Sequence, residues 1–304
     1  MRHLRRLSIA AAVFLLLGGA TYFLVNRQSD KKPVAAAKPA AQPVHIDGIR
    51  LETGNGEVLA LDGNNATTSA TVNGVQLNND KETLRFEGTN TTTEKWNTLT
   101  VPAKLDYKVV LADGSQVWLN ANTRLRFPFA FPANSREVIV DGEAYFKIAP
   151  DAARPFIVNV GHSRLEVLGT EFNVNNYGGK TITASLVKGA VAVKNETDRV
   201  VLAPGREAVY ADAGKVKVKD FEEEHVISWI NGIYTFRNTP LSVMTDVVPR
   251  MFDVQVVFDD PETAAIRFTG AMDKHDDLSV FVRNLELAAE IKSYYKNGVL
   301  HLKQ

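Results

Sequence analysis

The sequence predicts a single-pass membrane anchor, followed by an all-β domain built as a sandwich or as stacked hairpins, and then a small α+β domain. Three features of the 304-residue chain support this prediction. A charge-free apolar run covers Leu7–Val25, apolar and polar residues alternate from residue 44 to about 218, and the apolar spacing becomes helical after Trp229. Alternation is typical of half-buried strands, whereas spacings of three and four residues are typical of amphipathic helices.

The apolar run reads LSIAAAVFLLLGGATYFLV. As a helix it would span about 28 Å, close to the ~30 Å hydrocarbon core of a bilayer. A cleaved signal peptide is the alternative, with Gly18–Ala20 as a small-residue cleavage site, but the run continues to Val25, which favours the anchor. We therefore expect a cytoplasmic stub at residues 1–6, a transmembrane helix at 7–25 in the inner membrane, and the bulk of the chain in the periplasm.

Composition narrows the class of protein further. Residues 26–43, which include SDKKPVAAAKPAAQP, have the proline, alanine and lysine content of an extended linker. The formal net charge of the whole chain is zero, which gives no support for a direct nucleic-acid partner. The chain has no cysteine, so disulfides, cysteine-ligated zinc and cysteine nucleophiles are excluded.

Strand patterns fill a β-rich segment at residues 44–98 and continue, more clearly, through a domain at 99–220. REVIVDG and GEAYFKIA both alternate apolar and polar residues. Glycine-containing turn signals separate the patterns, and they predict tight hairpins because Asn-Gly and Asp-Gly adopt the positive φ angles that such turns need. These signals are Asp62-Gly63, Asn73-Gly74, Asp113-Gly114, Asp141-Gly142, Gly178-Gly179 and Pro204-Gly205.

The stretch LADGSQVWLNANTRLRFPFAF, residues 111–131, combines turns, alternation and aromatic residues. Its pattern predicts a hairpin at Asp113-Gly114 and a strand with Val117 and Leu119 on one face. Pro128 is expected to end the following strand, because proline cannot donate to a sheet ladder. We interpret this stretch as scaffold rather than as a ligand site.

The segment 229–304 predicts the α+β domain, in the order helix, strand, strand, helix, strand, strand. The strands are expected at 253–260 and 266–272, and the last two form a hairpin at Asn297-Gly298. Asp276 or Asp277 is expected to cap the second helix. The helical positions are Leu241, Met244, Val247 and Val248 after Pro240, and then Leu278, Phe281, Val282 and Leu285.

A family resemblance rests on motifs in a fixed order: LADGSQVWLNANTRLRFP, DGEAYFKI, RPFIVNV and LEVLGTEFNVNNY. Over about residues 99–215 this series resembles FecR-type anti-sigma factors, most of all those of Bacteroidetes. WINGIYTFRNTPLSVMTDVVPRMFDVQVVFDD and FTGAM resemble the small C-terminal domain of those proteins, which is similar to the secretin/TonB short N-terminal module.

The resemblance implies a regulator that binds the N-terminal signalling domain of a TonB-dependent outer-membrane receptor. It also implies an extracytoplasmic-function sigma factor as partner, and control of transcription of uptake genes for iron chelates or glycans. Family members carry a helical cytoplasmic region before the membrane, whereas MRHLRR stands here. Six residues cannot form such a region, because isolated helices need about 12–15 residues. We expect a start further upstream, or otherwise a sensor without direct sigma-factor contact.

The motifs predict no enzyme, and no cofactor or metal is expected. The one candidate for chemistry is Gly169-Thr170 in LGTEF. The resemblance implies self-cleavage there, in which the Thr170 hydroxyl attacks the preceding carbonyl and water opens the resulting ester. A glycine bulge is the alternative, and it is the interpretation that we favour.

A periplasmic carbohydrate-binding or structural β-module without sigma-factor contact is the alternative function. A glycan binder should display aromatic rings on an exposed platform, whereas Trp96, Trp118 and Trp229 fall inside apolar patterns. The short strands of the C-terminal domain offer edges that suit pairing with a strand of a partner. Both observations favour a FecR-type regulator over a carbohydrate-binding module.

Overall fold

The structure is a computed structural model. It describes residues 48–63, 66–80, 82–87, 95–179, 181–211 and 214–304. The predicted anchor at 7–25 and the linker at 26–43 lie outside these residues. Among the residues that are described, no helix combines the length and apolar character needed to cross a membrane. The chain from Ile46 onward forms one compact unit.

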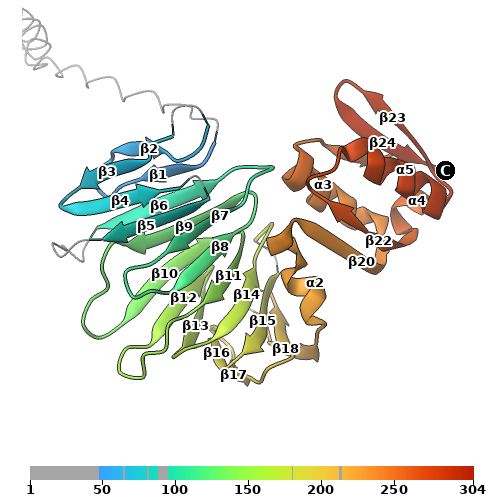
Figure 1. The fold of residues 1–304 in the computed structure, drawn as a ribbon. Helices are drawn as coiled ribbons and strands as arrows, with labels where there is room; N and C mark the ends of the chain where they lie inside the picture. The colour runs from blue at the N-terminus through green and yellow to red at the C-terminus, as the bar shows by residue number, and fades with distance from the viewer. Residues whose placement is uncertain (1–47, 64–65, 81, 88–94, 180, 212–213) are drawn as a thin grey trace, which may run out of the picture. The chain divides into compact units, whose positions relative to one another are not determined.

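Two large sheets make up the β region (Figure 1). Over the described residues the first has the order β17-β16-β13-β12-β10-β9-β6-β1-β2, and the second has the order β19-β18-β15-β14-β11-β8-β7-β5-β4-β3. The strands of the first sheet are β1 (Arg50–Glu52), β2 (Val58–Ala60), β6 (Trp96–Val101), β9 (Thr123–Pro128), β10 (Arg136–Asp141), β12 (Phe156–Val160), β13 (Ser163–Val167), β16 (Val191–Lys194) and β17 (Arg199–Leu202). Those of the second sheet are β3 (Ser69–Val72), β4 (Val75–Asn79), β5 (Thr83–Glu87), β7 (Tyr107–Val110), β8 (Gln116–Leu119), β11 (Glu143–Lys147), β14 (Glu171–Asn175), β15 (Ile182–Lys188), β18 (Arg206–Tyr210) and β19 (Lys217–Asp220).

The two sheets face one another across a shared apolar core. Phe146 of β11 and Phe156 of β12 come from different sheets, and their ring centroids are 6.5 Å apart. Burial of each such ring contributes about 1.5–3 kcal/mol to folding. The chain passes back and forth between the two sheets, and most neighbouring strands in each sheet are close together in the sequence. The sandwich therefore also resembles a stack of hairpins. The prediction of an all-β domain is confirmed.

Local alternation is observed as predicted. Val117 and Leu119 are buried in β8, Trp118 between them is half-buried, and β9 ends at Pro128. Asn73-Gly74 joins β3 to β4 as a two-residue hairpin, with Val72 opposite Val75.

Three of the predicted hairpin turns are wrong. Asp62-Gly63 lies between β2 and β3, Asp141-Gly142 lies between β10 and β11, and Pro204-Gly205 lies between β17 and β18, so each connects strands of different sheets. They are corners of the sandwich rather than hairpins. Gly142 is required there because its φ is +115° and an added Cβ would lie 2.8 Å from the Cα of Thr123. A glycine with a positive φ is needed at a corner between sheets as well as in a hairpin. A dipeptide such as Asp-Gly therefore does not distinguish the two kinds of turn.

The C-terminal region has its own core and its own small sheets, with orders β20-β22 and β21-β24-β23. All eight apolar residues predicted to face inward from its two helices are buried. Its elements are α2 (Glu223–Ile227), η1 (Ser228–Asn231), β20 (Ile233–Pro240), η2 (Leu241–Val243), α3 (Met244–Phe252), β21 (Val256–Phe258), α4 (Pro261–Ala265), β22 (Arg267–Asp273), α5 (Leu278–Ala289), β23 (Lys292–Lys296) and β24 (Val299–Lys303).

Sequence patterns missed four elements of this region: α2, η1, β20 and α4. Strand β20 buries only Phe236, and its pairing with β22 shifts register before Thr239, so it shows no clear period of two. Helix α4 has five residues, which is too short for a helical period to appear. The cap of α5 is Asp277, whose side chain accepts a hydrogen bond of 2.8 Å from the backbone of Ser279. Asn297-Gly298 forms the predicted hairpin between β23 and β24.

A buried ion pair ties the 111–131 stretch to the rest of the sandwich. Arg136 has no exposed side-chain surface, and its Nη1 donates to Asp113 Oδ2 at 2.8 Å and to the Ala149 carbonyl at 2.7 Å. Its Nε donates to the Arg154 carbonyl at 3.0 Å. A single guanidinium group therefore holds the turn at Asp113 to the loop between β11 and β12.

Arg136→Ala should lower the free energy of unfolding by about 3–5 kcal/mol, because Asp113 would remain as an unpaired buried charge. Arg85→Ala is the matched control: the side chains of the Arg85–Asp80 pair are 50% and 53% exposed, and losing such a pair costs about 1 kcal/mol or less. Urea unfolding of both variants measures the difference. An equal loss for the two would contradict the role given to Arg136.

Candidate functional site

The predicted site residues Gly169 and Thr170 lie between β13 and β14, in a tightly packed loop. The Thr170 side chain is buried, and its Oγ1 donates to the Ala190 carbonyl at 2.9 Å. A Cβ on Gly169 would lie 2.9 Å from the Cα of Pro150, so no larger residue fits without a shift. The register of β14 against β15 slips immediately afterwards, at Glu171. Glycine is thus needed for close approach beside a bulge, and self-cleavage stays a prediction from the resemblance alone.

We expect purified full-length protein to run as one band on a denaturing gel, because the Thr170 hydroxyl is held by a carbonyl acceptor. Thr170→Ala should leave this pattern unchanged. Two fragments whose junction maps between Gly169 and Thr170, and which disappear in Thr170→Ala but not in a Thr197→Ala control, would show that the loop cleaves itself.

A buried carboxylate stands at the start of β11. Glu143 is 7% exposed, its Oε1 accepts a hydrogen bond of 3.0 Å from Asn173 Nδ2, and its Oε2 accepts one of 2.8 Å from Asn120 Nδ2. Burial raises the pKa of Glu143, and the hydrogen bonds from the two amides act in the opposite direction. The carboxyl group is therefore costly to bury and is compensated by two fixed donors.

The same two amides reach the C-terminal region. The Tyr234 hydroxyl of β20 donates to Asn120 Oδ1 at 2.8 Å, and the Trp229 indole of η1 donates to Asn173 Oδ1 at 3.3 Å. Each amide thus donates to Glu143 and accepts from one aromatic side chain. The result is a network with two arms that joins β8, β11 and β14 to the start of the C-terminal region.

Helix α3 makes a second set of contacts with the β region. The guanidinium carbon of Arg250 lies 4.0 Å from the ring centroid of Tyr177, a cation–π arrangement, and the Arg250 carbonyl accepts from the Lys104 amide at 2.7 Å. Lys274, after β22, forms an ion pair with Asp106. Burial raises the pKa of the Tyr177 hydroxyl, which donates to the Ala121 carbonyl and is neutral at ordinary pH.

A polar cavity of about 390 Å³ lies beside this network. Some of its polar groups satisfy one another, since Ser185 Oγ donates to Glu207 Oε2 at 2.9 Å. The residues that line the cavity come mainly from the second sheet and from α3, so the cavity lies at the junction between them. It is lined by Glu143, Asn173, Asn175, Tyr177, Thr181, Thr183, Ser185, Glu207, His225, Val226, Val243, Asp246, Val247 and Arg250.

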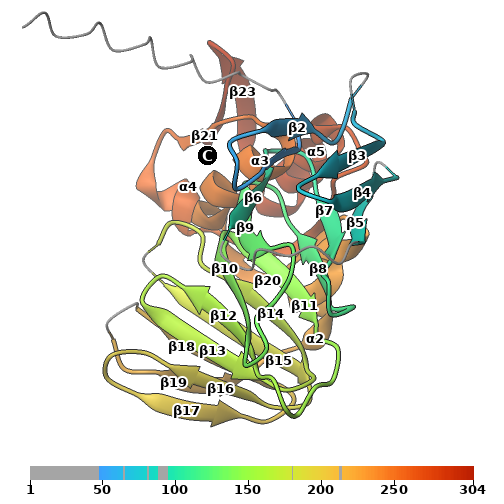
Figure 2. The same cartoon turned by 90° about the vertical axis from the view of Figure 1, so that its left-hand side faces the viewer.

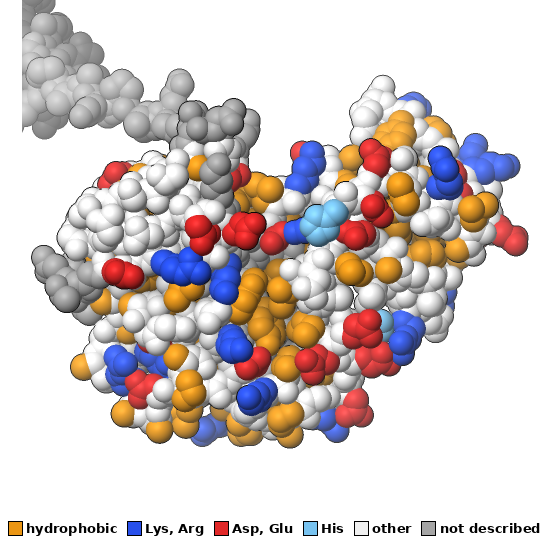
Figure 3. Space-filling view, in the orientation of Figure 1, with side chains coloured by type: hydrophobic (Ala, Val, Ile, Leu, Met, Phe, Trp, Pro, Cys, Tyr) orange, Lys and Arg blue, Asp and Glu red, His pale blue; other side chains and the backbone are white. Residues whose placement is uncertain are grey.

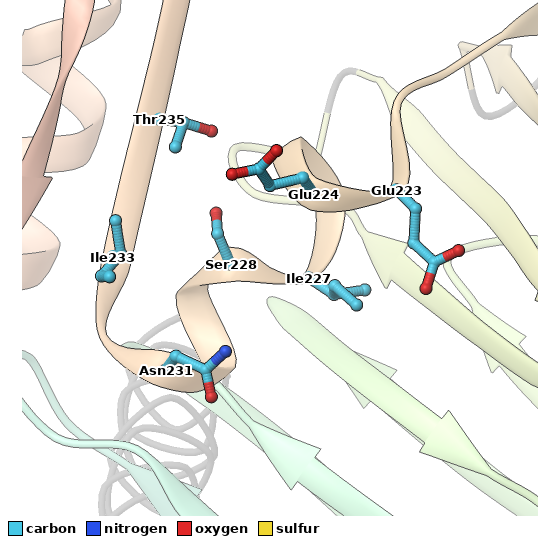
Figure 4. A pocket seen from close by; sticks show the side chains of 7 residues that line it. All are labelled: Glu223, Glu224, Ile227, Ser228, Asn231, Ile233 and Thr235. Atoms are coloured by element: carbon cyan, nitrogen blue, oxygen red, sulfur yellow. The ribbon is translucent and has the colours of Figure 1, made fainter.

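A second cavity of about 390 Å³ lies at α2 and β20 (Figure 4). Glu224, Ser228 and Thr235 point toward the same space, whereas Glu223 points away from it. It holds no arrangement of a nucleophile with a base. Within the described ranges, no group of three or more His, Asp or Glu side chains could hold a metal ion. On the face drawn in Figure 3, basic and acidic side chains are interspersed rather than gathered into a basic strip.

Two family profiles match the chain: "FecR protein" over residues 97–192, and "FecR, C-terminal" over residues 233–300. The chain belongs to the FecR family. The resemblance expected from the sequence motifs is therefore confirmed for both regions. A search among curated proteins gave no match.

Solved structures agree with this assignment. Two crystal structures of a candidate anti-sigma factor from Parabacteroides distasonis ATCC 8503, at 1.65 and 2.50 Å resolution, are each 26% identical to this chain with a TM-score of 0.62. The matches cover 67% and 69% of this chain, and 97% and 99% of those chains. The FecR protein described here is thus an anti-sigma factor or sensor of a regulatory, non-enzymatic kind.

Sequence reasoning did not single out the residues of the junction. Glu143 is the third residue of the motif DGEAYFKI, and Asn120 and Asn173 lie in the motifs LNANT and EFNVNN. All three occupy the polar positions of an apolar alternation, so the pattern gave no signal that they are buried. Outward polar positions are ordinary on a solvated sheet face, and only the packing of Trp229 and Tyr234 against them makes them buried.

The stability of this FecR protein should depend on pH through Glu143. An acid whose pKa is higher in the folded chain than in the unfolded chain binds more protons when folded. The free energy of unfolding should therefore fall as the pH rises from the ordinary glutamate value of 4.5 toward the raised pKa of Glu143. Urea unfolding at a series of pH values measures this slope.

Glu143→Gln should remove that part of the slope, because an amide does not titrate. Glu57→Gln is the matched control, since Glu57 is exposed. If the difference in stability between the unsubstituted protein and Glu143→Gln is the same at every pH, the coupling of Glu143 to folding is refuted.

Proposed function

We propose that this FecR protein is an inner-membrane regulator that relays a signal from a TonB-dependent outer-membrane receptor to an extracytoplasmic-function sigma factor. The genes controlled would serve uptake of iron chelates or glycans. Residues 7–25 would anchor the chain in the inner membrane, with the described region in the periplasm. The family assignment and the apolar run support this proposal.

The observation that carries the proposal is the free edge of the C-terminal sheet. Strand β23 is the last strand in the order β21-β24-β23, and most of its length is exposed. Tyr294 and Tyr295 on this strand are 38% and 57% exposed. An edge strand presents unpaired backbone groups to which a strand of another protein can add. The N-terminal signalling domain of the receptor is the proposed partner at this edge.

The Glu143 network would transmit the effect of partner binding from the C-terminal region to the sandwich. Trp229 and Tyr234 stand at the start of that region, and each reaches Glu143 through one amide. A displacement of the C-terminal region would have to break the Tyr234–Asn120 and Trp229–Asn173 hydrogen bonds. Both of these amides also donate to the buried Glu143 carboxyl group. Such buried networks favour one arrangement over alternatives, because a half-satisfied network is costly.

Sigma-factor contact would take place on the cytoplasmic side of the anchor, through sequence N-terminal to residues 7–25. The described region would then act as the periplasmic sensor. This division matches the charge-free apolar run between MRHLRR and the linker. It makes receptor binding and sigma-factor binding separable in experiment.

Affinity purification of the tagged full-length protein from cross-linked envelopes, followed by mass spectrometry, tests the proposal. We expect recovery of a TonB-dependent receptor and of a sigma factor. Tyr295→Arg should reduce recovery of the receptor but not of the sigma factor, because it alters only the periplasmic edge. Val58→Ser, on the exposed strand β2, is the matched control and should change neither.

Failure to recover either partner from envelopes that contain both would refute the relay. Retention of the protein on immobilised glycan instead would favour a carbohydrate-binding β-module. Among the tryptophans, Trp229 is 4% exposed and Trp118 packs edge-on against Tyr145, with ring centroids 5.7 Å apart. Neither ring forms an open platform, which is why the relay is the function that we propose.

A further inference from the structure

The first large sheet ends at β17, and none of the described strands pairs with its outer side. In Figure 2 this strand lies at the lower margin of the sandwich. Val201 on it is 66% exposed, which is unusual for a large apolar side chain, and Leu168 in the nearby loop is 50% exposed. This edge belongs to the β domain and is separate from the junction with the C-terminal region.

A row of three basic side chains crosses the outer face at this edge. Arg164 of β13 is directly opposite Lys194 of β16, and Lys194 is directly opposite Arg199 of β17. All three are exposed. None of the three forms an ion pair with a carboxylate of the described part of the chain. Like charges placed directly opposite each other destabilise a sheet. Glu166 lines the same cavity as these three residues but forms no ion pair with any of them.

The edge of the second sheet shows the opposite arrangement. On β18 and β19, Arg206 is opposite Asp220 and Glu207 is opposite Lys219, with ion-pair distances of 3.1 and 2.9 Å. These four charges are paired within the chain. The comparison indicates that the unpaired row on β17 is particular to that edge.

The neighbouring row on the same face contains one acidic and two apolar residues. Glu166 is opposite Ala192, and Ala192 is opposite Val201. Because Ala192 is small, a cavity of about 290 Å³ opens over it, with Leu168 and Val201 among its lining. A second cavity of about 290 Å³ adjoins it and is lined by Arg164, Glu166, Ala192, Lys194 and Arg199. This row and the basic row are two residues apart along each strand, which is the spacing of side chains on one face of a strand.

We propose that β17 is a docking edge for an extended segment of another protein, with an acidic and an apolar residue two positions apart. A strand added to this edge would place alternate side chains on the face that carries Arg199 and Val201. An acidic residue beside Arg199 would complete the basic row, and an apolar residue beside Val201 would fill the groove over Ala192. Charge complementarity and the open ladder point to the same occupant.

A labelled peptide of alternating sequence tests the docking edge. One face of the probe carries Glu and Val in turn, the other face carries Thr, and a matched peptide has Lys in place of Glu. Fluorescence anisotropy with the full-length protein in detergent measures binding. We expect the Glu peptide to bind and the Lys peptide to bind at least about tenfold more weakly.

Charge reversal at the edge provides the sharper test. Lys194→Glu combined with Arg199→Glu should exchange the preference, so that the Lys peptide binds better than the Glu peptide. Ala192→Phe should weaken both peptides by filling the groove. Lys217→Glu, on the exposed edge strand β19, is the matched control and should leave binding unchanged. Unaltered thermal unfolding of the variants shows that the sandwich remains folded.

Equal binding of the two peptides, or a preference that survives the charge reversal, would overturn the proposal. Sedimentation with phosphatidylglycerol vesicles distinguishes the other source of negative charge. If the protein sediments with these vesicles in an Arg199-dependent manner and neither peptide binds, the basic row binds an anionic lipid surface and not a protein strand.

Discussion

The arrangement of this FecR protein depends on one buried carboxyl group. Glu143 accepts hydrogen bonds from Asn120 and Asn173, and those amides in turn accept from Tyr234 and Trp229. Among the residues that the structure describes, the sandwich and the C-terminal region have separate apolar cores, and no continuous hydrophobic core joins them. Polar contacts around Glu143 and Arg250 make the connection instead. These contacts give a reason for an acidic residue to be buried at the start of a core strand.

Polar junctions and apolar cores differ in what they specify. Apolar burial is non-directional and tolerates small shifts, whereas a hydrogen-bonded carboxyl group demands particular partners at particular distances. The Glu143 junction therefore adds little net stability but defines how the first residues of the C-terminal region sit on β8, β11 and β14. A regulator needs a connection that transmits a displacement of one domain to the other. Such a connection can depend on a small number of hydrogen bonds.

Three edge strands differ in how their side chains protect the unpaired backbone groups of the sheet edge. At β19 opposite charges pair across strands, at β17 like charges stand unpaired beside a groove, and at β23 lysines flank two exposed tyrosines. Unpaired edges promote association, and charged side chains are the usual protection against it. An edge whose charges repel one another is protected from copies of itself while remaining open to an acidic strand.

The sequence by itself determined the local elements and the family. Alternation placed Val117 and Leu119 in the core, helical spacing placed Leu241 and Leu285 there, and Asn297-Gly298 formed its hairpin, because each depends on neighbours within a few residues. Only the tertiary structure decided that Asp141-Gly142 is a corner, that Glu143 is buried, and that three basic residues share one row. Those features depend on strand registers and on packing between segments tens of residues apart, for which local periodicity carries no signal.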